Sequence, residues 1–477
     1  MKKYILLLSV LIPCLGLFSC KKFLEERAQT DVIPRTAESL NELLLGEGYQ
    51  GGARNISLQP TLLDDDKEQT AAFLGTKGSY YVFTWQPDQE IGLGRSNLAT
   101  APWGAYYELI QICNVVLDYS DKVTGTAAEK DYITGQAHLL RAFYYFKLVN
   151  LYGKPFADSR STPDQDLGVP LMLSSGVALE GKKRNTVKEV YQQITQDLDK
   201  GIAALERTKR AGGPYRINYL AGYFLASRVY LHMADWQKVI AAATVVLQNK
   251  PDLADLNTWG VPDHNKKPVI GVTNPETIWA FGSYNDIVSG EVDVLNYSLS
   301  ADLRALYEKG DLRAGIYLNG KKSAKRGTDY TSISKTAQAF RVSEALLNRA
   351  EAYARLNKAG DAGSGQLAIN DLNTLRKKRF ATDAYADLVL GTADDLLQKC
   401  YAEKRREFFA EEEHRWFDLR RQGMPGISHY YYEAAGQRLR YDLLDHDPAY
   451  VLQIPSGAIK LNNKLIDNPK PAVRVGK

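Results

Sequence analysis

A dense run of charged side chains lies at residues 403–415, and carboxylates in such a run can act as general acids and bases. Glu403, Glu407 and Glu411 are four residues apart, so a helix places all three on one face. Arginine and lysine residues lie between them, and opposite charges three or four residues apart stabilise a helix by about 0.2–0.5 kcal/mol per pair. We therefore interpret the run as a structural lattice of ion pairs and not as a catalytic site.

A second acidic group consists of Asp64, Asp65 and Asp66, followed by Glu68, and its oxygen atoms have the chemistry that calcium prefers. The group lacks the spaced ligands and the glycine of an EF-hand loop. The sequence therefore favours a solvated acidic turn. Structural calcium remains the alternative, and we predict no cofactor and no metal ligands elsewhere in the chain.

The patterns that mark nucleophilic, metal-dependent and dinucleotide-dependent enzymes are missing from the sequence. None of the six histidines pairs with another at ligand spacing, and H-E-x-x-H, C-x-x-C and G-x-S-x-G do not occur. The segment Gly92-Leu93-Gly94 lacks the third glycine of a dinucleotide-binding loop. We predict that the chain is not an enzyme and has no catalytic residue. A glycosidase, with two carboxylates about 5–9.5 Å apart across a cleft, stays open as an alternative.

Aromatic side chains supply the other candidate chemistry. The chain has 29 tyrosines and 14 phenylalanines, and a tyrosine combines a flat apolar face with a polar hydroxyl group. A sugar ring can stack its C–H face on such a plane while neighbouring amides bond to its hydroxyls. The candidate ligand contacts lie in two stretches without helical periodicity, residues 50–104 and 252–340. They are Tyr80, Tyr81, Trp85 and Asn97 in the first stretch, and Trp279, Tyr284 and Tyr297 in the second.

The elements that must position these rings are mostly amphipathic helices. Between residues 131 and 152 apolar side chains recur every three or four positions, and Gly153 ends the pattern. Thr186 and Glu189 form the capping box of a following helix. Trp103 begins another helical stripe and is assigned to the core. Further helices are predicted at about residues 218–232, 236–248, 341–356, 366–379 and 396–421.

One helix pair fits a known repeat. Tyr230, Asp235, Trp236, Leu247 and Pro251 fall at tetratricopeptide positions in a 34-residue frame, although alanines are missing at two usual places. Several amphipathic helix pairs in one chain favour a helical-repeat core. Minor β structure is predicted near the C-terminus, at residues 441–455, in runs such as residues 450–454.

The N-terminus has the organisation of an export signal. Lys2 and Lys3 precede an apolar run at residues 4–17, which is shorter than the roughly 20 residues that span a bilayer. The run ends in Ser19 and Cys20, which predicts a cleaved signal over residues 1–19. A cysteine at this place resembles the acylation site of bacterial lipoproteins. We predict that Cys20 carries the lipid (palmitate) anchor, since several acyl chains hold a protein on a membrane.

The net charge and the cysteine content limit which classes of protein remain. The net charge of +4 on 477 residues is too balanced for a nucleic-acid-binding protein. After the signal and the anchor, Cys113 and Cys400 remain, both in predicted helices. A disulfide between them and two buried thiols are both open.

Several motifs, in their order along the chain, resemble the SusD/RagB family of outer-membrane lipoproteins. The resemblance covers nearly the full length. Glu413 departs from it where many relatives have glycine, and Asp467 where glutamine is usual. The matching motifs are residues 22–25 (KFLE), 135–145 (GQAHLLRAFYY), 151–153 (LYG), 341–353, 403–421, 453–455 (QIP) and 468–469 (NP).

The resemblance implies a fold and a role. The fold has about four tetratricopeptide-like helix pairs packed against an irregular ligand-binding region with minor β structure, in a single domain at residues 20–477. The role is capture of a nutrient glycan at the cell surface and its delivery to a TonB-dependent transporter of the outer membrane. A peptide-capturing member of the family and a protein-binding scaffold without a small ligand are the alternatives. Exposed coplanar rings would favour sugar, and a charged cleft with free backbone groups would favour peptide.

Overall fold

The computed structural model describes residues 34–51, 60–70, 77–87, 89–92, 101–176, 180–210, 213–259, 268–282, 297–319, 322–325, 338–433 and 436–477. Cys20 and the predicted signal lie outside these residues, as do the candidate ligand contacts Asn97 and Tyr284.

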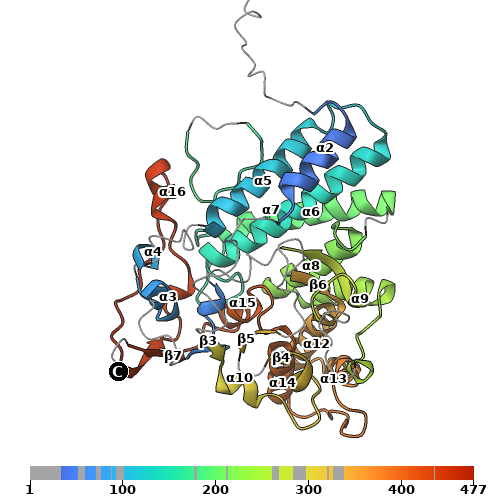
Figure 1. The fold of residues 1–477 in the computed structure, drawn as a ribbon. Helices are drawn as coiled ribbons and strands as arrows, with labels where there is room; N and C mark the ends of the chain where they lie inside the picture. Colours follow the sequence, from blue (N-terminus) through green and yellow to red (C-terminus); the bar gives the residue numbers. More distant parts are fainter. Residues whose placement is uncertain are drawn as a thin grey trace, which may run out of the picture.

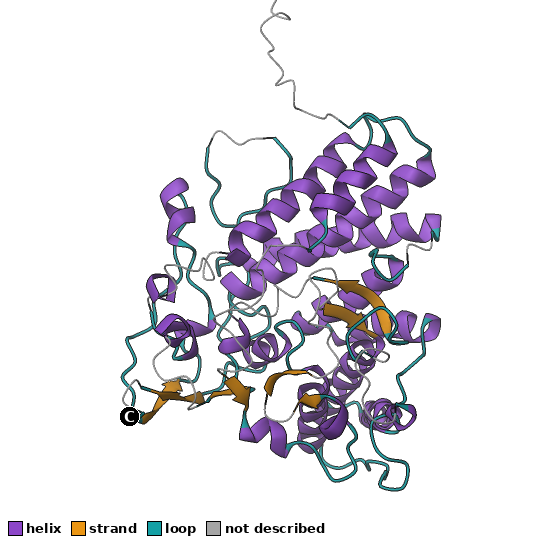
Figure 2. Cartoon of the chain, viewed as in Figure 1, coloured by secondary structure: helices purple, strands orange, loops and turns teal. Residues whose placement is uncertain are grey.

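Helices form most of the described chain, and strands are few and short (Figures 1 and 2). The longer helices are α5 (Ala101–Tyr119), α6 (Ala127–Tyr152), α7 (Val187–Thr208), α8 (Tyr219–His232), α9 (Trp236–Asn249), α12 (Val342–Lys358), α13 (Ala362–Arg376), α14 (Ala393–Phe408) and α15 (His414–Arg421). The shorter ones are α2 (Ala37–Leu43), α3 (Lys77–Phe83), α4 (Gln89–Gly92), α10 (Ala301–Ala305), α11 (Arg313–Ile316) and α16 (Ser456–Leu461). The mostly helical prediction is confirmed.

The strands form three small antiparallel sheets. The pairs β2 (Thr277–Phe281) with β6 (Gln338–Arg341), and β7 (Ile427–Tyr432) with β8 (Arg438–Leu443), are two of them. The third has the order β1-β3-β5-β4, from β1 (Lys67–Gln69), β3 (Tyr297–Leu299), β5 (Lys322–Lys325) and β4 (Leu318–Asn319). Of the β structure predicted at residues 441–455, only the end of β8 at Leu443 is present, and the run at residues 450–454 is not a strand, because it begins at the end of a 3-10 turn at Pro448–Tyr450.

Helix α6 is the centre of the repeat part. It packs against α5 on one side and most extensively against α7 on the other (Figure 1). The sequence shows one apolar stripe, but nearly every side chain from Tyr132 to Tyr152 is buried, as expected for a helix covered on all sides. At Gly135 an added Cβ would lie 2.7 Å from Leu205, so glycine lets α6 and α7 approach closely.

The remaining long helices continue the pairing. α8 packs against α9, α9 against α12, and α12 against both α13 and α14, so the predicted helical-repeat core is confirmed. The predicted capping box of α7 is present, with Glu189 N–H donating to Thr186 Oγ1 and Thr186 N–H donating to Glu189 Oε2. The helix predicted at residues 396–421 is two helices. The chain turns between them, where Ala410 and Glu412 have φ angles of 56° and 44°.

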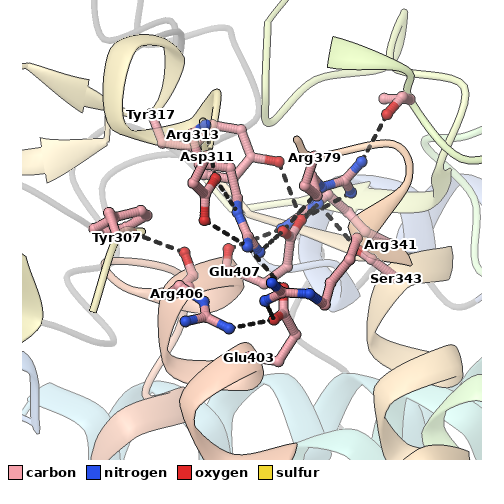
Figure 3. A network of polar contacts seen from close by, with 12 residues as sticks. Tyr307, Asp311, Arg313, Tyr317, Arg341, Ser343, Arg379, Glu403, Arg406 and Glu407 are labelled. Atoms are coloured by element: carbon pink, nitrogen blue, oxygen red, sulfur yellow. Dashed lines mark hydrogen bonds and ion pairs between the residues drawn. The ribbon is translucent and has the colours of Figure 1, made fainter. Parts of the chain in front are cut away.

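A buried network of charges joins the repeat helices to the irregular part (Figure 3). Glu407 of α14 accepts from three fully buried arginines that come from separate elements. The distances to its oxygens are 3.0 Å from Arg313 of α11, 2.9 Å from Arg341 of β6 and 3.0 Å from Arg379 after α13. Glu276, just before β2, also pairs with Arg341 and Arg379. The interpretation of the charged run as structural is confirmed, but most partners are distant in sequence and not on the same helix.

A further cluster, centred on Glu412, extends this pattern through the helices. Lys147 of α6 contacts Glu412 and Glu413 at 2.5 Å each, and Arg228 of α8 pairs with Glu412 and with Glu344 of α12. The unusual Glu413 is therefore a partner of a buried lysine. Buried ions are costly unless they are paired and hydrogen-bonded, so each cluster fixes the relative positions of the helices that supply it.

We expect Glu407→Gln to lower the free energy of unfolding by about 3–5 kcal/mol, because it leaves three buried guanidinium groups without their shared anion. Denaturant unfolding followed by circular dichroism measures this change. Glu180→Gln is the control, since the Glu180 side chain is 82% exposed and its removal is expected to change the free energy by less than about 0.5 kcal/mol. Equal effects of the two variants would contradict the structural role of Glu407.

Acid should weaken the same network. Burial raises the pKa of Glu403, but Arg313, Arg406 and Arg376 outweigh it and lower that pKa from 4.5 to about 2. The unfolded chain then binds a proton at higher pH than the folded chain, so stability is lost as pH falls through this window. Urea unfolding at a series of pH values should show a free energy that decreases between about pH 4.5 and 2. A free energy independent of pH over that range would contradict the assignment.

Candidate ligand-binding site

Helix α3 carries the two predicted rings that are partly exposed, Tyr80 and Tyr81. The Tyr80 ring meets Tyr81, Tyr431 of β7 and Tyr441 of β8 edge-on, with centroid distances of 5.3, 5.0 and 5.8 Å. The hydroxyl groups of Tyr80 and Tyr441 are 3.3 Å apart. We call these four residues the tyrosine group. Tyr431 and Tyr441 were missed from the sequence, although polar and apolar residues alternate along β8 (Arg-Leu-Arg-Tyr-Asp-Leu).

His429 holds α3 against the β7–β8 hairpin. Its ring stacks between Phe83 and Trp85 with centroid distances of 4.0 and 4.1 Å, and its nitrogens bond to the backbone oxygens of Phe83 and Asp64. Burial lowers the pKa of His429 to about 4, although the two backbone carbonyl oxygens act in the opposite direction. The position of Tyr80 and Tyr81 therefore depends on a buried aromatic stack.

Three of the predicted ligand contacts belong to the core. The exposed fractions of Trp85, Trp279 and Tyr297 are 0%, 0% and 1%. Trp85 Nε1 donates to the Leu63 carbonyl, and Trp279 stacks on Phe281 at 4.3 Å. The prediction of ligand contact is wrong for these three rings, because packing leaves them no surface to offer. Trp103 is buried as predicted.

A groove with a volume of about 410 Å³ lies beside the tyrosine group. One wall is the segment at residues 86–90, which includes the start of α4, and the other is the C-terminal segment at residues 449–471 with α16. Figure 1 shows α3, α4, α16 and β7 on the same side of the molecule. The polar lining of the groove consists of Gln86, Gln89, Glu90, Gln453, Ser456, Asp467 and Lys470. Prolines and aliphatic side chains complete the lining.

Gln86 connects the groove to the tyrosine group. Its Nε2 lies 3.4 Å from the Tyr80 hydroxyl and donates to the Arg474 carbonyl at 2.9 Å, while Arg474 N–H donates back to Gln86 Oε1. Gln86 is itself only 4% exposed, so it acts as a buried link between the tyrosine group and the C-terminal segment, 388 residues away along the chain.

Glu90 joins the two walls of the groove. Its carboxylate accepts from Ser456 N–H at 3.0 Å and from Ser456 Oγ at 3.0 Å, and α16 has no buried residue of its own. The other lining carboxylate, Asp467, accepts from the backbone N–H of Ile454 at 2.7 Å. The unusual Asp467 thus shapes the groove, and both carboxylates have structural partners.

The acidic group at residues 64–66 is not the solvated turn that the sequence favours. Asp64 and Asp66 are buried, Asp65 pairs with Arg415 at 2.6 Å, and Asp66 pairs with Arg405 at 2.6 Å. Arginines on α14 and α15 supply the positive charge here, so the turn anchors the chain before β1.

One set of metal-ligating side chains clusters within the described residues. Ligand atoms of Glu344, Glu412 and His414 lie within 4.8 Å of one another. Arg228 pairs with both carboxylates, so their charge is already compensated and the set does not fit a divalent metal. Cys113 and Cys400 are free and buried, which decides between the two alternatives for them.

Paired helices beside an amide-lined groove define a helical-repeat binding protein. Residues 22–231 match a family model described as starch-binding associating with outer membrane, and residues 277–470 match the SusD family model. The chain belongs to the SusD family. No helix among the described residues is long and apolar enough to cross a membrane.

Individual relatives agree with this assignment. SusD-like protein P2 of Formosa agariphila is 22% identical over an alignment of 383 positions, with 68% of this chain and 72% of that protein covered. A SusD superfamily protein of Bacteroides thetaiotaomicron superposes with a TM-score of 0.71 at 20% identity, covering 91% of this chain and all of that one. A protein of Bacteroides vulgatus described as a putative sugar binding protein has a TM-score of 0.72 at 18% identity, covering 93% and 100%.

The assignment of rings to core and surface can be tested through stability. We expect Trp279→Ala to lower the free energy of unfolding by about 3–5 kcal/mol, because it opens a cavity in the core. Tyr81→Ala, at a half-exposed ring, is expected to cost less than half as much. Denaturant midpoints of the two variants measure the difference, and a Trp279→Ala protein as stable as the parent would contradict the burial of this ring.

Proposed function

We propose that the protein captures a nutrient glycan at the outer surface of the cell and passes it, chemically unchanged, to a TonB-dependent outer-membrane transporter. The observation that carries the proposal is the joining of half-exposed rings to an amide-lined groove through Gln86. A sugar unit can pack its C–H face on the Tyr81 ring while its hydroxyls bond to the amides of Gln89 and Gln453.

Family membership supports the same role. Two solved relatives are described as a putative sugar binding protein and a SusD-like carbohydrate binding protein. The second has a TM-score of 0.68 and 20% identity. The predicted lipid anchor at Cys20 would hold the chain on the outer membrane, where a transporter partner is within reach.

A peptide is the second candidate ligand, and the groove itself gives the reason. Among the residues that the structure describes, no aromatic side chain lines it, while Glu90, Asp467 and Lys470 do. Among the described residues the coplanar ring pairs, such as Trp416 with Tyr450 and Phe224 with Phe340, are buried. The partly exposed rings of the tyrosine group therefore favour a sugar ligand, whereas the charged lining of the groove is compatible with a peptide.

A binding screen separates the candidates. The chain from the residue after Cys20 would be run in native gels that contain single polysaccharides, and titrated by calorimetry with polysaccharides and peptides. Binding to a polysaccharide, with no new reducing ends after long incubation, supports glycan capture without hydrolysis. Binding of peptides alone would contradict the glycan proposal, and new reducing ends would contradict the non-enzymatic role.

Tyr81→Ala is expected to weaken binding of the polysaccharide identified in this screen by about five- to thirtyfold, since truncating a central ring costs about 1–2 kcal/mol. Tyr215→Ala is the matched control, because Tyr215 is 55% exposed and belongs neither to the groove nor to the tyrosine group. Calorimetry of both variants measures the effect. Unchanged affinity in Tyr81→Ala would exclude the ring as a contact.

A further inference from the structure

The β7–β8 hairpin has a second face, opposite the tyrosine group. Side chains alternate along both strands, so Tyr431 and Tyr441 point inward while Tyr430, Arg438 and Arg440 point outward. Tyr430 is 39% exposed and lies directly across from Arg440 in the strand register. The outer face thus combines an aromatic plane with guanidinium groups, and no contact described above uses it.

Arg438 is the unusual member of this face. Its guanidinium carbon lies 3.9 Å from the centroid of the Tyr430 ring, and among the described residues no carboxylate pairs with it. Stacking on an aromatic ring holds a guanidinium group in one orientation and leaves its N–H groups directed outward. A guanidinium prepared in this way can bind a carboxylate or sulfate through two parallel hydrogen bonds.

The cations next to Arg438 differ from it, because they have an acidic partner. Arg440 Nε lies 2.7 Å from Asp442 Oδ1, and its Nη2 lies 3.0 Å from Ser428 Oγ, so its charge is balanced within the hairpin. Lys477 Nζ lies 3.5 Å from the same Asp442. Arg440 and Lys477 therefore share one carboxylate, and Arg438 adds a positive charge to the outer face without an acidic partner among the described residues.

The backbone of the hairpin leaves little room for an extended peptide. The two strands pair over all six positions of the register. On the outer edge of β8, Arg440 exchanges both backbone hydrogen bonds with Lys477, and on the edge of β7 the Tyr432 N–H donates to Gln69. Recognition here must come from side chains, and a sugar acid presents an apolar ring face and an anion on the same unit.

We propose that Tyr430 and Arg438 form a subsite for an acidic sugar, either a uronate or a sulfated residue. This inference rests on the proposed capture of a glycan and names its class as anionic. The ring of the sugar packs beside Tyr430, and its carboxylate or sulfate accepts hydrogen bonds from Arg438. A polysaccharide that carries such units can occupy the groove and this subsite together.

The test compares acidic polysaccharides with neutral partners of the same backbone. Polygalacturonate is paired with its methyl ester and dextran sulfate with dextran, in native gels and by calorimetry at low and high salt. At least one acidic member is expected to bind about tenfold more tightly than its neutral partner, with a preference that shrinks as salt screens the charge.

Arg438→Gln is expected to remove the preference and leave affinity for the neutral partner unchanged. Arg207→Gln is the matched control, because it removes one exposed positive charge on α7, where the side chain is 59% exposed, and should keep the preference. Tyr430→Ala should weaken binding of the acidic member while its circular dichroism spectrum stays that of the parent.

The outcomes separate this inference from the proposed function. Equal binding of acidic and neutral members, or a preference that survives in Arg438→Gln, overturns the acidic subsite and leaves glycan capture standing. Binding of poly-glutamate that depends on Arg438, without binding of any polysaccharide, replaces the sugar by an acidic peptide and overturns both. A preference lost in Arg438→Gln but kept in Arg207→Gln supports the subsite.

Discussion

The shared carboxylate of Glu407 is the constraint on which the arrangement of the molecule depends. Helix α14 presents it to three guanidinium groups, and each of these comes from a different element of the chain. Burial raises the pKa of Glu407, but the arginines outweigh burial and hold that pKa well below its usual range, so the carboxylate stays ionised. Unpaired ions at this depth would be strongly destabilising. These ion pairs therefore fix the position of the repeat helices relative to the irregular part.

A series of ion pairs and stacked rings connects this network to the candidate site. Arg405 and Arg415, on α14 and α15, pair with Asp66 and Asp65 ahead of β1. His429 then stacks between Phe83 and Trp85 and sets α3 against the hairpin. The rings of the tyrosine group therefore lie on a buried base of stacked aromatic side chains. The opposite wall of the groove, α16, has no buried residue and depends on Glu90.

Some of this arrangement could be predicted from the sequence, and the reasons differ between elements. Long helices such as α7 were predictable because their apolar period and capping box are local signals. Burial of Trp85 and Trp279 was not, because whether a ring in an irregular stretch faces solvent depends on partners far along the chain. For the same reason Tyr431 and Tyr441 were missed, and charge pairs such as Asp65 with Arg415 were mistaken for solvated groups.

The central claim is that a glycan binds where rings and amides meet at Gln86. The most direct measurement is a crystal structure of the chain from the residue after Cys20, soaked with an oligosaccharide cut from a polysaccharide that the protein retains. The account predicts sugar density against Tyr81 and in the groove at residues 86–90 and 449–471. Density only on the outer surface of the repeat helices, with the groove unchanged, would contradict it.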